Sequence, residues 1–489
     1  MPVVAGIDSS TQSCTVELRD ADSGVRLGTG RAPHPVTHPP LSEQDPEAWW
    51  RALGAALNLA CQEAGVRPNA IDALSVTAQC HGLVALDSTG GVLRPAKLWN
   101  DTTSAPQATR LVTQYGAREW VRAIGLTPTA ALTVTKLAWL ADHEPGNLRR
   151  LAAVLVPHDW LTYRLTGERT TDRSDASGTG YYAAFEQRWR TDLLADLVSE
   201  EVDWDAAVPK VLGPTEPAGH VLPQASAELG LRPGVPVGPG GGDQHLGAVG
   251  LGLKHGDVVY SLGTSGVVFS ASTDPVFDFT GWVDGVADAT GGYLPLVCTL
   301  NAAKVTDTFA RLLGTDVIGL GALALAADPA QQRPTLVAYL DGERSPSLPR
   351  AQGLLAGLTT ASTREGLALS VFEGVVFGLV RGHRAIEAVG VPTSGNVLVA
   401  GGGARSPAYR QVLADVLGRP VITRDAPEAS ARGACVQAAA VLSGTGITTM
   451  RDAWCPPPAA TVEPRPCDSA AVMESYLTLA DQVQGRSGD

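Results

Sequence analysis

The chain has 489 residues, 44% of them hydrophobic, a size that suits about two to three folded domains and excludes a wholly disordered chain. Its 50 acidic residues outnumber 37 basic ones, the net charge is −13, and no stretch is rich in Lys and Arg. The sequence thus lacks the positive surface that nucleic acids require, and we expect no nucleic-acid partner. A local phosphate site made of backbone N–H groups and a metal ion stays compatible with this charge.

The seven cysteines are scattered, and none is spaced as Cys-X-X-Cys. An odd, scattered set predicts neither a disulfide framework nor a zinc site, and it suits a reducing compartment. The first residues, MPVVAGID, lack the basic and apolar regions of a secretion signal. We also find no predominantly apolar run of about 18 residues. We therefore expect a cytoplasmic protein with no membrane partner.

The N-terminal half alternates predicted strands with predicted helices. Short apolar or alternating runs predict strands, and apolar residues at helical spacing predict helices. The expected strands are residues 3–8, 14–20, 25–30 and 73–79, with helices across much of 104–200. One helix has marked ends: Asp45 suits the N-cap, Pro46 suits the first turn, and Gly65 can end the helix.

The order of elements begins again in the second half. The expected strands there are residues 257–263, 266–272 and 396–403, with helices at about 301–313 and 406–418. Each half thus opens with a strand, a turn of Gly, Ser and Thr, and a second strand. This repeat predicts a duplicated α/β architecture whose boundary lies near residues 244–256. We divide the chain into two domains, residues 1–244 and 245–489.

Two turns of similar composition stand at these equivalent places, GIDSSTQS (6–13) and SLGTSG (261–266). Hydroxyl and backbone N–H groups in such turns can hold phosphate oxygens, and Asp8 could hold a hydrated Mg²⁺. Each turn alone is equally compatible with an ordinary hairpin, because Gly, Ser and Asp are common turn residues. One such loop in each half favours a triphosphate ligand, although neither GXXXXGK(S/T) nor an N-terminal GXGXXG is present.

Four further clusters have a functional and a structural interpretation. Seven glycines surround Asp243 in residues 235–252, and they indicate either a plain turn or a ligand lying against the main chain. GGGAR (401–405) follows a predicted strand, where ligands commonly bind, or is a tight turn. His81 after a strand is either a ligand contact or a structural residue. Trp99-Asn100-Asp101 suits a polyol, or is a packed Trp with a turn.

The chain resembles the FGGY family of carbohydrate kinases in nine stretches that stand in the family's order along nearly the whole chain. They are GIDSSTQS, LSEQDPEAWW, AQCHG, LRPAKLWND, TGERTTDRSDASGTGYY, GGGDQHLGAVG, SLGTSG, YLDGERSP and VAGGGARSPAYRQVLADVLG. The resemblance implies an α/β fold of two duplicated actin/hexokinase-like (ribonuclease H-like) domains with a cleft between them. EQDPEAWW and LRPAKLWND favour the branch of the family that phosphorylates D-xylulose.

The resemblance also implies roles for individual residues. Asp243 is expected to be the catalytic base, which accepts the proton of a sugar hydroxyl as that oxygen attacks the γ-phosphate of ATP. The sugar pocket would consist of Cys80, His81, Asp243 and Gln244. The phosphates and Mg²⁺ would lie among Asp8, Ser10, Thr11, Gly263, Thr264 and Ser265, with Asp8 binding Mg²⁺ directly or through water. The adenosine would lie over Gly401, Gly402, Gly403 and Ala404. Asp243 could also be the N-cap of its helix.

Four positions depart from the family's usual residues. Thr15 stands where a Lys or Arg usually follows the first loop, which bears on phosphate binding. Cys80, Thr103 and Gln244 replace the usual Met, Arg and Asn, which bears on the choice of sugar. The alternatives are a kinase for another ketose or alditol and a non-catalytic sugar or nucleotide sensor, and the retained Asp243 favours an enzyme. The expected partners are a small sugar and ATP, and assembly as a homodimer is left open.

Overall fold

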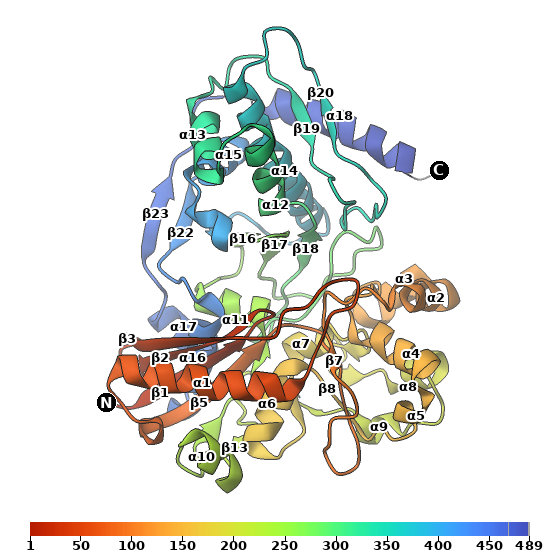
Figure 1. The fold of residues 1–489 in the computed structure, drawn as a ribbon, viewed down its shortest axis with the longest axis vertical. Helices are drawn as coiled ribbons and strands as arrows, with labels where there is room; N and C mark the ends of the chain where they lie inside the picture. The colour runs from red at the N-terminus through yellow and green to blue at the C-terminus, as the bar shows by residue number, and fades with distance from the viewer. Residues whose placement is uncertain (468, 488–489) are drawn as a thin grey trace. The chain divides into compact units, whose positions relative to one another are not determined.

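A computed structural model describes residues 1–467 and 469–487, and the chain forms two compact units. Unit 1 consists of Met1–Leu253, Val286–Tyr293 and Ala426–Pro456, and unit 2 of Lys254–Gly285, Leu294–Asp425 and Pro457–Asp489. The chain therefore returns to unit 1 after entering unit 2 (Figure 1). The expected domains, residues 1–244 and 245–489, follow chain order alone. Packing instead joins 426–456 with the N-terminal unit, because this segment covers one face of that unit's sheet.

Unit 1 is built on a seven-stranded sheet of order β13-β14-β5-β1-β2-β3, with β15 also paired to β5. Its strands are β1 (Val3–Ser9), β2 (Ser13–Asp20), β3 (Arg26–Pro33), β5 (Ile71–Ala78), β13 (Gly219–His220), β14 (Pro236–Val237) and β15 (Gly241–Gly242). β1 runs antiparallel to β2 and parallel to β5. The strands expected at 3–8, 14–20, 25–30 and 73–79 are confirmed as β1, β2, β3 and β5.

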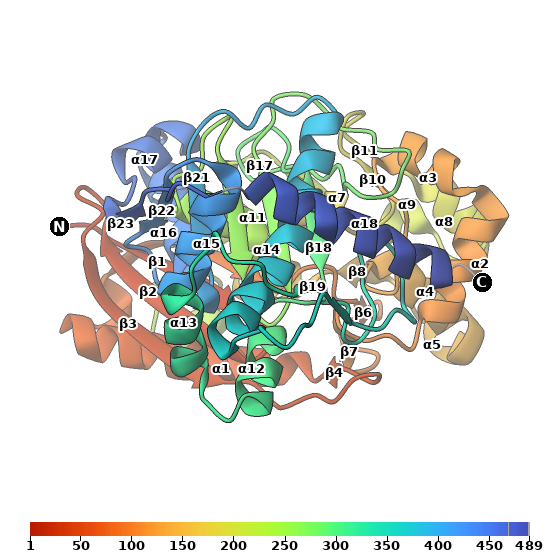
Figure 2. The ribbon, with the colours of Figure 1, turned by 90° about the horizontal axis from the view of Figure 1, so that it is seen from above.

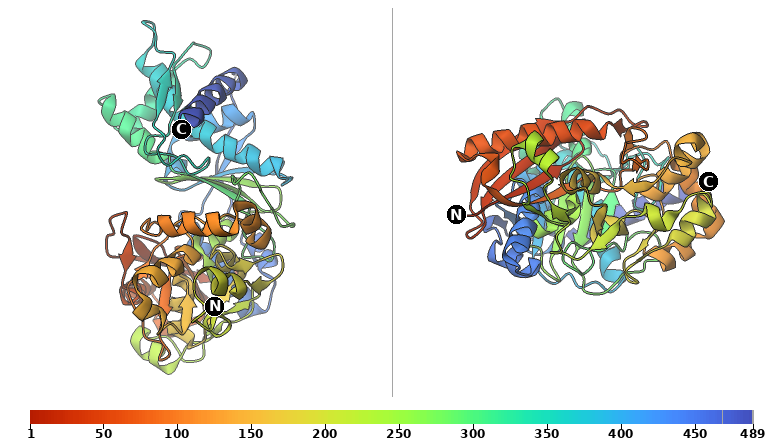
Figure 3. Two further views of the ribbon diagram at one scale, coloured as in Figure 1. Left: turned by 90° about the vertical axis from the view of Figure 1, so that its right-hand side faces the viewer. Right: turned by 90° about the horizontal axis from the view of Figure 1, so that it is seen from below.

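Two helices cover the two faces of this sheet, α1 (Pro46–Ala64) over β2 and β3, and α16 (Ala429–Ser443) over β1 and β5 (Figure 3). Asp45 caps α1 by accepting the Glu47 N–H, and Gly65 ends it in the left-handed region, as expected. Gly6 lets α16 approach, because a Cβ there would lie 1.9 Å from the carbonyl oxygen of Ala431. Both faces of the sheet are therefore buried against helices.

The rest of unit 1 consists of shorter elements. Its further helices are α2 (Ala105–Tyr115), α3 (Ala117–Ile124), α4 (Thr133–His143), α5 (Pro145–Leu148), α6 (Pro157–Thr166), α7 (Arg173–Ser177), α8 (Thr191–Leu197), α9 (Trp204–Ala207), α10 (Pro223–Leu229), α11 (Asp243–Gly250) and α17 (Ile447–Ala453). Its short strand pairs are β4 (Glu43–Gln44) with β7 (Ala96–Lys97), β6 (Val84–Leu86) with β8 (Ala153–Leu155), β9 (Thr170–Asp172) with β12 (Lys210–Leu212), and β10 (Tyr182–Ala183) with β11 (Arg188–Trp189).

Unit 2 repeats the strand pattern of unit 1 in a six-stranded sheet of order β18-β17-β16-β21-β22-β23. Its strands are β16 (Val258–Leu262), β17 (Gly266–Ser270), β18 (Leu296–Thr299), β21 (Val397–Ala400), β22 (Val421–Arg424) and β23 (Pro458–Val462). β16 is antiparallel to β17 and parallel to β21, just as β1 is antiparallel to β2 and parallel to β5. The expected duplicated α/β architecture is confirmed.

The helices of unit 2 pack around a long central one, α14 (Arg364–Ala388). The others are α12 (Ala303–Leu312), α13 (Val317–Ala326), α15 (Pro407–Leu417) and α18 (Ser469–Ser487), with the pair β19 (Thr335–Val337) and β20 (Leu354–Ala356). α18 lies across α14 and β19 (Figure 2). Phe372 and Phe377 of α14 are fully buried in the core of this unit.

α14 is long and apolar enough to cross a membrane, a run that the sequence analysis passed over. In unit 2, however, 78% of its most apolar window is buried by protein, which is usual for a core helix. α12 and α13 pass the same test only as a pair bent by 86°.

Candidate active site

The candidate residues of unit 1 meet at one edge of its sheet. β5 is parallel to both β1 and β15, with Asp8 paired to Thr77 and Gly242 paired to Ala78. The carboxyl ends of these three strands therefore lie side by side, which is where α/β sheets commonly bind ligands. Asp8 is the last residue but one of β1, Cys80 and His81 follow β5, and Asp243 follows β15.

Asp243 begins α11 and faces Cys80. Its Oδ1 accepts the Gln244 N–H at 2.8 Å and the Cys80 thiol at 3.4 Å. Burial raises the pKa of the Asp243 carboxyl to about 6 against these two hydrogen bonds, and the Asp175 charge raises it further. The N-cap of α11 is Gly242, so the alternative that Asp243 caps its helix is wrong.

Glycines set the depth at which α11 lies in unit 1. A Cβ on Gly250 would lie 1.9 Å from the carbonyl oxygen of Ala429, and one on Gly433 would lie 1.8 Å from that of Leu246. α11 and α16 therefore touch backbone to backbone. Ser430 of α16 also donates a hydrogen bond to the Asp243 carbonyl oxygen at 2.9 Å. These glycines serve close helix packing beside Asp243, a requirement that only a residue without a Cβ satisfies.

His81 is held in an uncommon backbone conformation by Asp175. Its φ is +63°, a region that residues other than glycine rarely adopt. Asp175 Oδ1 accepts the His81 N–H at 3.1 Å and lies 3.0 Å from the ring Nδ1. Gly178 leaves room for the ring, because a Cβ there would lie 1.9 Å from His81 Cε1. Asp175 thus fixes both the backbone and the ring, while the side chain stays 19% exposed.

The sequence analysis missed Asp175 as a site residue. It lies in α7, whose N-cap Asp172 accepts the N–H groups of Ser174 and Asp175. Burial raises the pKa of Asp175 to about 6, and the nearby His158 opposes this rise. The signal was the second Asp of DRSD within the TGERTTDRSDASGTGYY stretch, one of the family-like motifs.

Asp8 and the turn after it form the second part of this edge. Ser10 Oγ donates to both Asp8 oxygens, at 2.8 and 3.0 Å. Burial and the charge of Asp243 raise the pKa of Asp8 to about 8, against the Ser10 hydrogen bond. Thr11 Oγ1 accepts a hydrogen bond from the ring N–H of Trp99 at 2.9 Å. The turn therefore carries hydroxyls around a carboxyl that lacks a close positive partner among the described residues.

The Trp99-Asn100-Asp101 motif has one end at the surface and the other in the core. Trp99 is 37% exposed and lies against the turn. Asp101 is fully buried and accepts hydrogen bonds from Lys97 Nζ at 3.1 Å and Thr103 Oγ1 at 2.5 Å. Thr103, at a position where the family often has Arg, thus bonds to both Lys97 and Asp101 of this network. Of this motif, Trp99 stays with the candidate site.

The candidate residues of unit 2 meet at one edge of the second sheet. β16 and β21 are parallel, with Ser261 paired to Ala400, so the turns that follow them leave the same edge. The first turn contains Gly263, Thr264 and Ser265, and the second contains Gly401, Gly402, Gly403 and Ala404. Gly401 has φ +80°, and a Cβ there would lie 2.7 Å from the Leu262 carbonyl oxygen. Gly402 is exposed with open space around its Cα, so the backbone of this turn is accessible.

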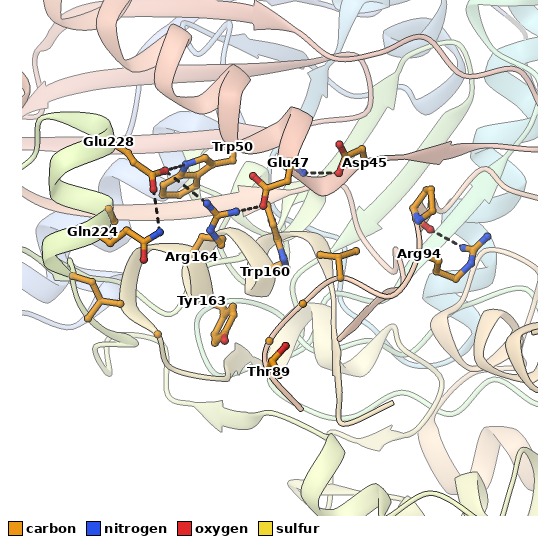
Figure 4. A pocket seen from close by; sticks show the side chains of 17 residues that line it. Asp45, Glu47, Trp50, Thr89, Arg94, Trp160, Tyr163, Arg164, Gln224 and Glu228 are labelled. Atoms are coloured by element: carbon orange, nitrogen blue, oxygen red, sulfur yellow. Dashed lines mark hydrogen bonds and ion pairs between the residues drawn. The ribbon is translucent and has the colours of Figure 1, made fainter. Parts of the chain in front are cut away.

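A separate hollow of about 710 Å³ lies elsewhere in unit 1, between α1, α6, α10 and the loop at residues 89–95 (Figure 4). Arg164 forms its floor, stacked on Trp50 and Trp160 and paired with Glu47 and Glu228. None of the sequence-predicted site residues lines it. Because Arg164 is already paired with two carboxylates and the predicted site residues lie elsewhere, this hollow is not the catalytic candidate.

Two groups of residues could hold a metal ion. Asp8 is half-buried, and the charges of Asp243 and Glu428 add to the rise in its pKa, so it is a carboxyl whose charge a divalent cation would offset. Cys80, His81 and Asp175 also place one potential ligand atom each within 4.8 Å of one another. In that group the His81 ring and the Asp175 carboxylate already pair at 3.0 Å. Oxygen ligands beside hydroxyls make Asp8 the position that suits Mg²⁺.

Models of the FGGY family of carbohydrate kinases match most of the chain, the N-terminal domain at residues 3–250 and the C-terminal domain at residues 258–442. The chain therefore belongs to the FGGY family of carbohydrate kinases. It is similar to the xylulose kinase of Streptomyces coelicolor, with 42% identity over 93% of this chain and 91% of that protein. The xylulose kinase of Escherichia coli is 34% identical over 85% and 84% of the two chains. The crystal structure of xylulose kinase from Bifidobacterium adolescentis superimposes with a TM-score of 0.87 at 38% identity, over 98% and 99%.

Proposed function

We propose that this protein is an ATP-dependent kinase that converts D-xylulose to D-xylulose 5-phosphate. The observation that carries the proposal is the Asp243 carboxylate at the start of α11, beside Cys80 and the His81 that Asp175 orients. The similarity to xylulose kinases over nearly the whole chain supports the choice of sugar. The seven free thiols suit the cytoplasm as its place of action, and a homodimer stays a prediction.

Asp243 acts as the general base in this proposal. Although its pKa is raised to about 6, Asp243 is still mostly ionised at neutral pH, and its basicity lies close to the working pH, which favours proton transfer. Both hydrogen bonds to the carboxylate go to Oδ1, so Oδ2 can accept the proton of the sugar's terminal hydroxyl. An ordinary carboxylate base suffices for phosphoryl transfer, because the loose transition state of this reaction depends mainly on positioning and on charge stabilisation.

The sugar pocket consists of Cys80, His81, Asp243 and Gln244 in this proposal. The Asp175 carboxylate, 3.0 Å from the His81 ring Nδ1, favours a proton on that nitrogen and leaves Nε2 as the acceptor in this proposal. The positive φ of His81 and the glycine at 178 keep the ring in place before sugar arrives. Such preorganisation reduces the entropy lost when the substrate is oriented.

The nucleotide would bind through the two loops and the glycine turn. Ser10 and Thr11 with Gly263, Thr264 and Ser265 offer hydroxyls and N–H groups to the phosphates, and Gly401, Gly402, Gly403 and Ala404 offer a flat surface to the adenosine. Asp8 would hold Mg²⁺, directly or through water. When bound, this ion neutralises phosphate charge that develops during transfer. Ser10 keeps the Asp8 carboxyl oriented through hydrogen bonds to both of its oxygens.

A panel assay tests the proposal. We expect ADP release, coupled to a spectrophotometric signal, to show its highest kcat/KM with D-xylulose among ketoses, pentitols and glycerol. A higher kcat/KM with another ketose or alditol would replace D-xylulose as the substrate. The absence of sugar-dependent ADP release across the panel would favour a sugar or nucleotide sensor instead.

His81→Ala is expected to weaken use of the sugar selectively. The loss leaves a sugar hydroxyl without its partner, at a cost of about 1–3 kcal/mol in kcat/KM for D-xylulose, with the KM for ATP unchanged. Steady-state kinetics with each substrate varied in turn measures this. His220→Ala, an exposed histidine in β13, is the matched control and should behave as the wild type. Equal losses for sugar and ATP would show that His81 has a structural role.

A further inference from the structure

We propose that Arg31 of β3 binds the phosphates of the nucleotide, supplying from the third strand a cation that the first loop does not contain. The residues of this loop, GIDSSTQS, include one acid and no base. The inference rests on the proposed function, since it takes ATP as the phosphoryl donor.

Arg31 lies in one row with Asp8 across three adjacent strands. Asp8 of β1 pairs with Thr15 of β2, and Thr15 pairs with Arg31 of β3, both in antiparallel register. Directly opposed residues of antiparallel strands project from the same face of a sheet, so the three side chains share one face. Neighbouring strands lie about 4.8 Å apart, which puts the Arg31 backbone roughly 10 Å from that of Asp8.

This shared face is the one that leaves Arg31 accessible. Residues at alternate positions on these strands, Ile7, Cys14 and Ala32, are buried in the core that includes α1. The opposite face is covered by α16 at β1, where Gly6 allows the close approach. β3 lies two strands further along the sheet, beyond that cover, and the Arg31 side chain is exposed.

The side chain of Arg31 is directed along the sheet toward the loop. Its Nε donates to Ser13 Oγ at 2.8 Å, and Ser13 is the first residue of β2 after the loop. In the residues that the structure describes, this is the one hydrogen bond of the Arg31 side chain, so the four N–H donors of its two Nη groups are available to a ligand. A guanidinium with its fork of donors presented in this way matches the oxygens of a phosphate.

The charges at this edge explain why a cation is needed there. Burial is the main cause of the raised pKa of Asp8; Asp243 and Glu428 raise it further and Arg31 lowers it, so the charge of Arg31 acts at this edge. A triphosphate that approaches Asp8 meets these carboxylates, and Thr15, the nearer residue of the row, is neutral and buried. In the row of Asp8, Thr15 and Arg31, the positive charge therefore lies on β3, one strand further from Asp8 than position 15 of β2.

The test compares Arg31→Gln with Arg31→Lys and with Arg26→Gln. Arg26 is an exposed arginine of the same strand, and its charge acts on Glu17 instead of Asp8. Because a charge-assisted hydrogen bond is lost, Arg31→Gln should raise the KM for ATP and the dissociation constant of ADP by about tenfold to a hundredfold. The KM for D-xylulose should stay within about twofold, Arg31→Lys should recover part of the loss, and Arg26→Gln should match the wild type.

Two results would overturn the role of Arg31. One is ATP kinetics and ADP binding within about twofold of the wild type in Arg31→Gln, and the other is an equal loss in Arg26→Gln, which would indicate a general effect of surface charge. Calorimetric titration with ADP measures binding without turnover. A wild-type protein that binds ADP but phosphorylates no sugar would contradict the proposed function while leaving the Arg31 inference open to this binding test.

Discussion

Asp243→Asn is expected to lower kcat by a factor of about 10² to 10⁴, the usual contribution of a general base. The amide keeps the size of the side chain and can still accept the Gln244 N–H, but it cannot take up the proton of the sugar hydroxyl. The dissociation constant of D-xylulose should change far less. Initial-rate assays and calorimetric titration with the sugar separate the two effects.

The pH dependence gives this prediction a second readout. Because the pKa of Asp243 is raised from 3.8 to about 6, the base is ionised above that pH and takes up a proton below it. The wild-type kcat/KM for sugar should therefore be level near neutral pH and fall about tenfold per unit below pH 6. The residual activity of Asp243→Asn should lack this acid limb.

A matched control is Asp192→Asn, which changes an exposed acid in the first turn of α8 in the same unit. Its kcat should stay within about twofold of the wild type, since surface substitutions of this kind cost little. A kcat near that of the wild type in Asp243→Asn would show that Asp243 is not the base.

Gly433→Ala is expected to cost about 3 kcal/mol of unfolding free energy, the upper end of the usual cost of overpacking. The added methyl would lie 1.8 Å from the Leu246 carbonyl oxygen, and backbone atoms have no rotamer by which to yield. α11 must therefore move away from α16 and carry Asp243 with it, so kcat should fall as well. Chemical denaturation and initial rates measure the two losses.

The control for this variant is Gly321→Ala, in α13. Gly321 is also a buried helical glycine, but the nearest atom to its added Cβ lies 3.7 Å away, an ordinary contact. Alanine has the higher helix propensity, so this change should be neutral or stabilise by up to about 1 kcal/mol. Equal losses in the two variants would mean that helix crossing does not constrain position 433.

The local elements could be predicted because their signals are local. Asp45, Pro46 and Gly65 mark the ends of α1 through contacts within the helix itself, and the structure places each where it was expected. The repeat of strand, turn and strand predicted the duplicated sheets in the same way. Resemblance to the family then selected Asp243 and His81, which the structure brings to one sheet edge.

What the sequence did not reveal depends on partners far apart along the chain. Asp175 holds His81 from 94 residues away, and no local pattern around His81 indicates such a partner. The sequence left Asp243 open as the cap of α11 because acids favour that place, but the backbone there gives the cap to Gly242. The apolar run of α14 was missed because glycines, an acid and basic residues interrupt it, although packing buries most of it.

The late position of α16 in the chain has a consequence for synthesis on the ribosome. Cys435 of α16 donates to the Glu17 carbonyl oxygen of β2, its partner 418 residues earlier. At about 5–20 residues per second, β2 leaves the ribosome roughly 20–80 seconds before this helix is made. Until then the sheet of unit 1 lacks the helix that fits against Gly6 and Gly250. A nascent chain that stops before residue 426 thus contains Asp243 and its helix α11 but lacks α16, the helix against which α11 packs.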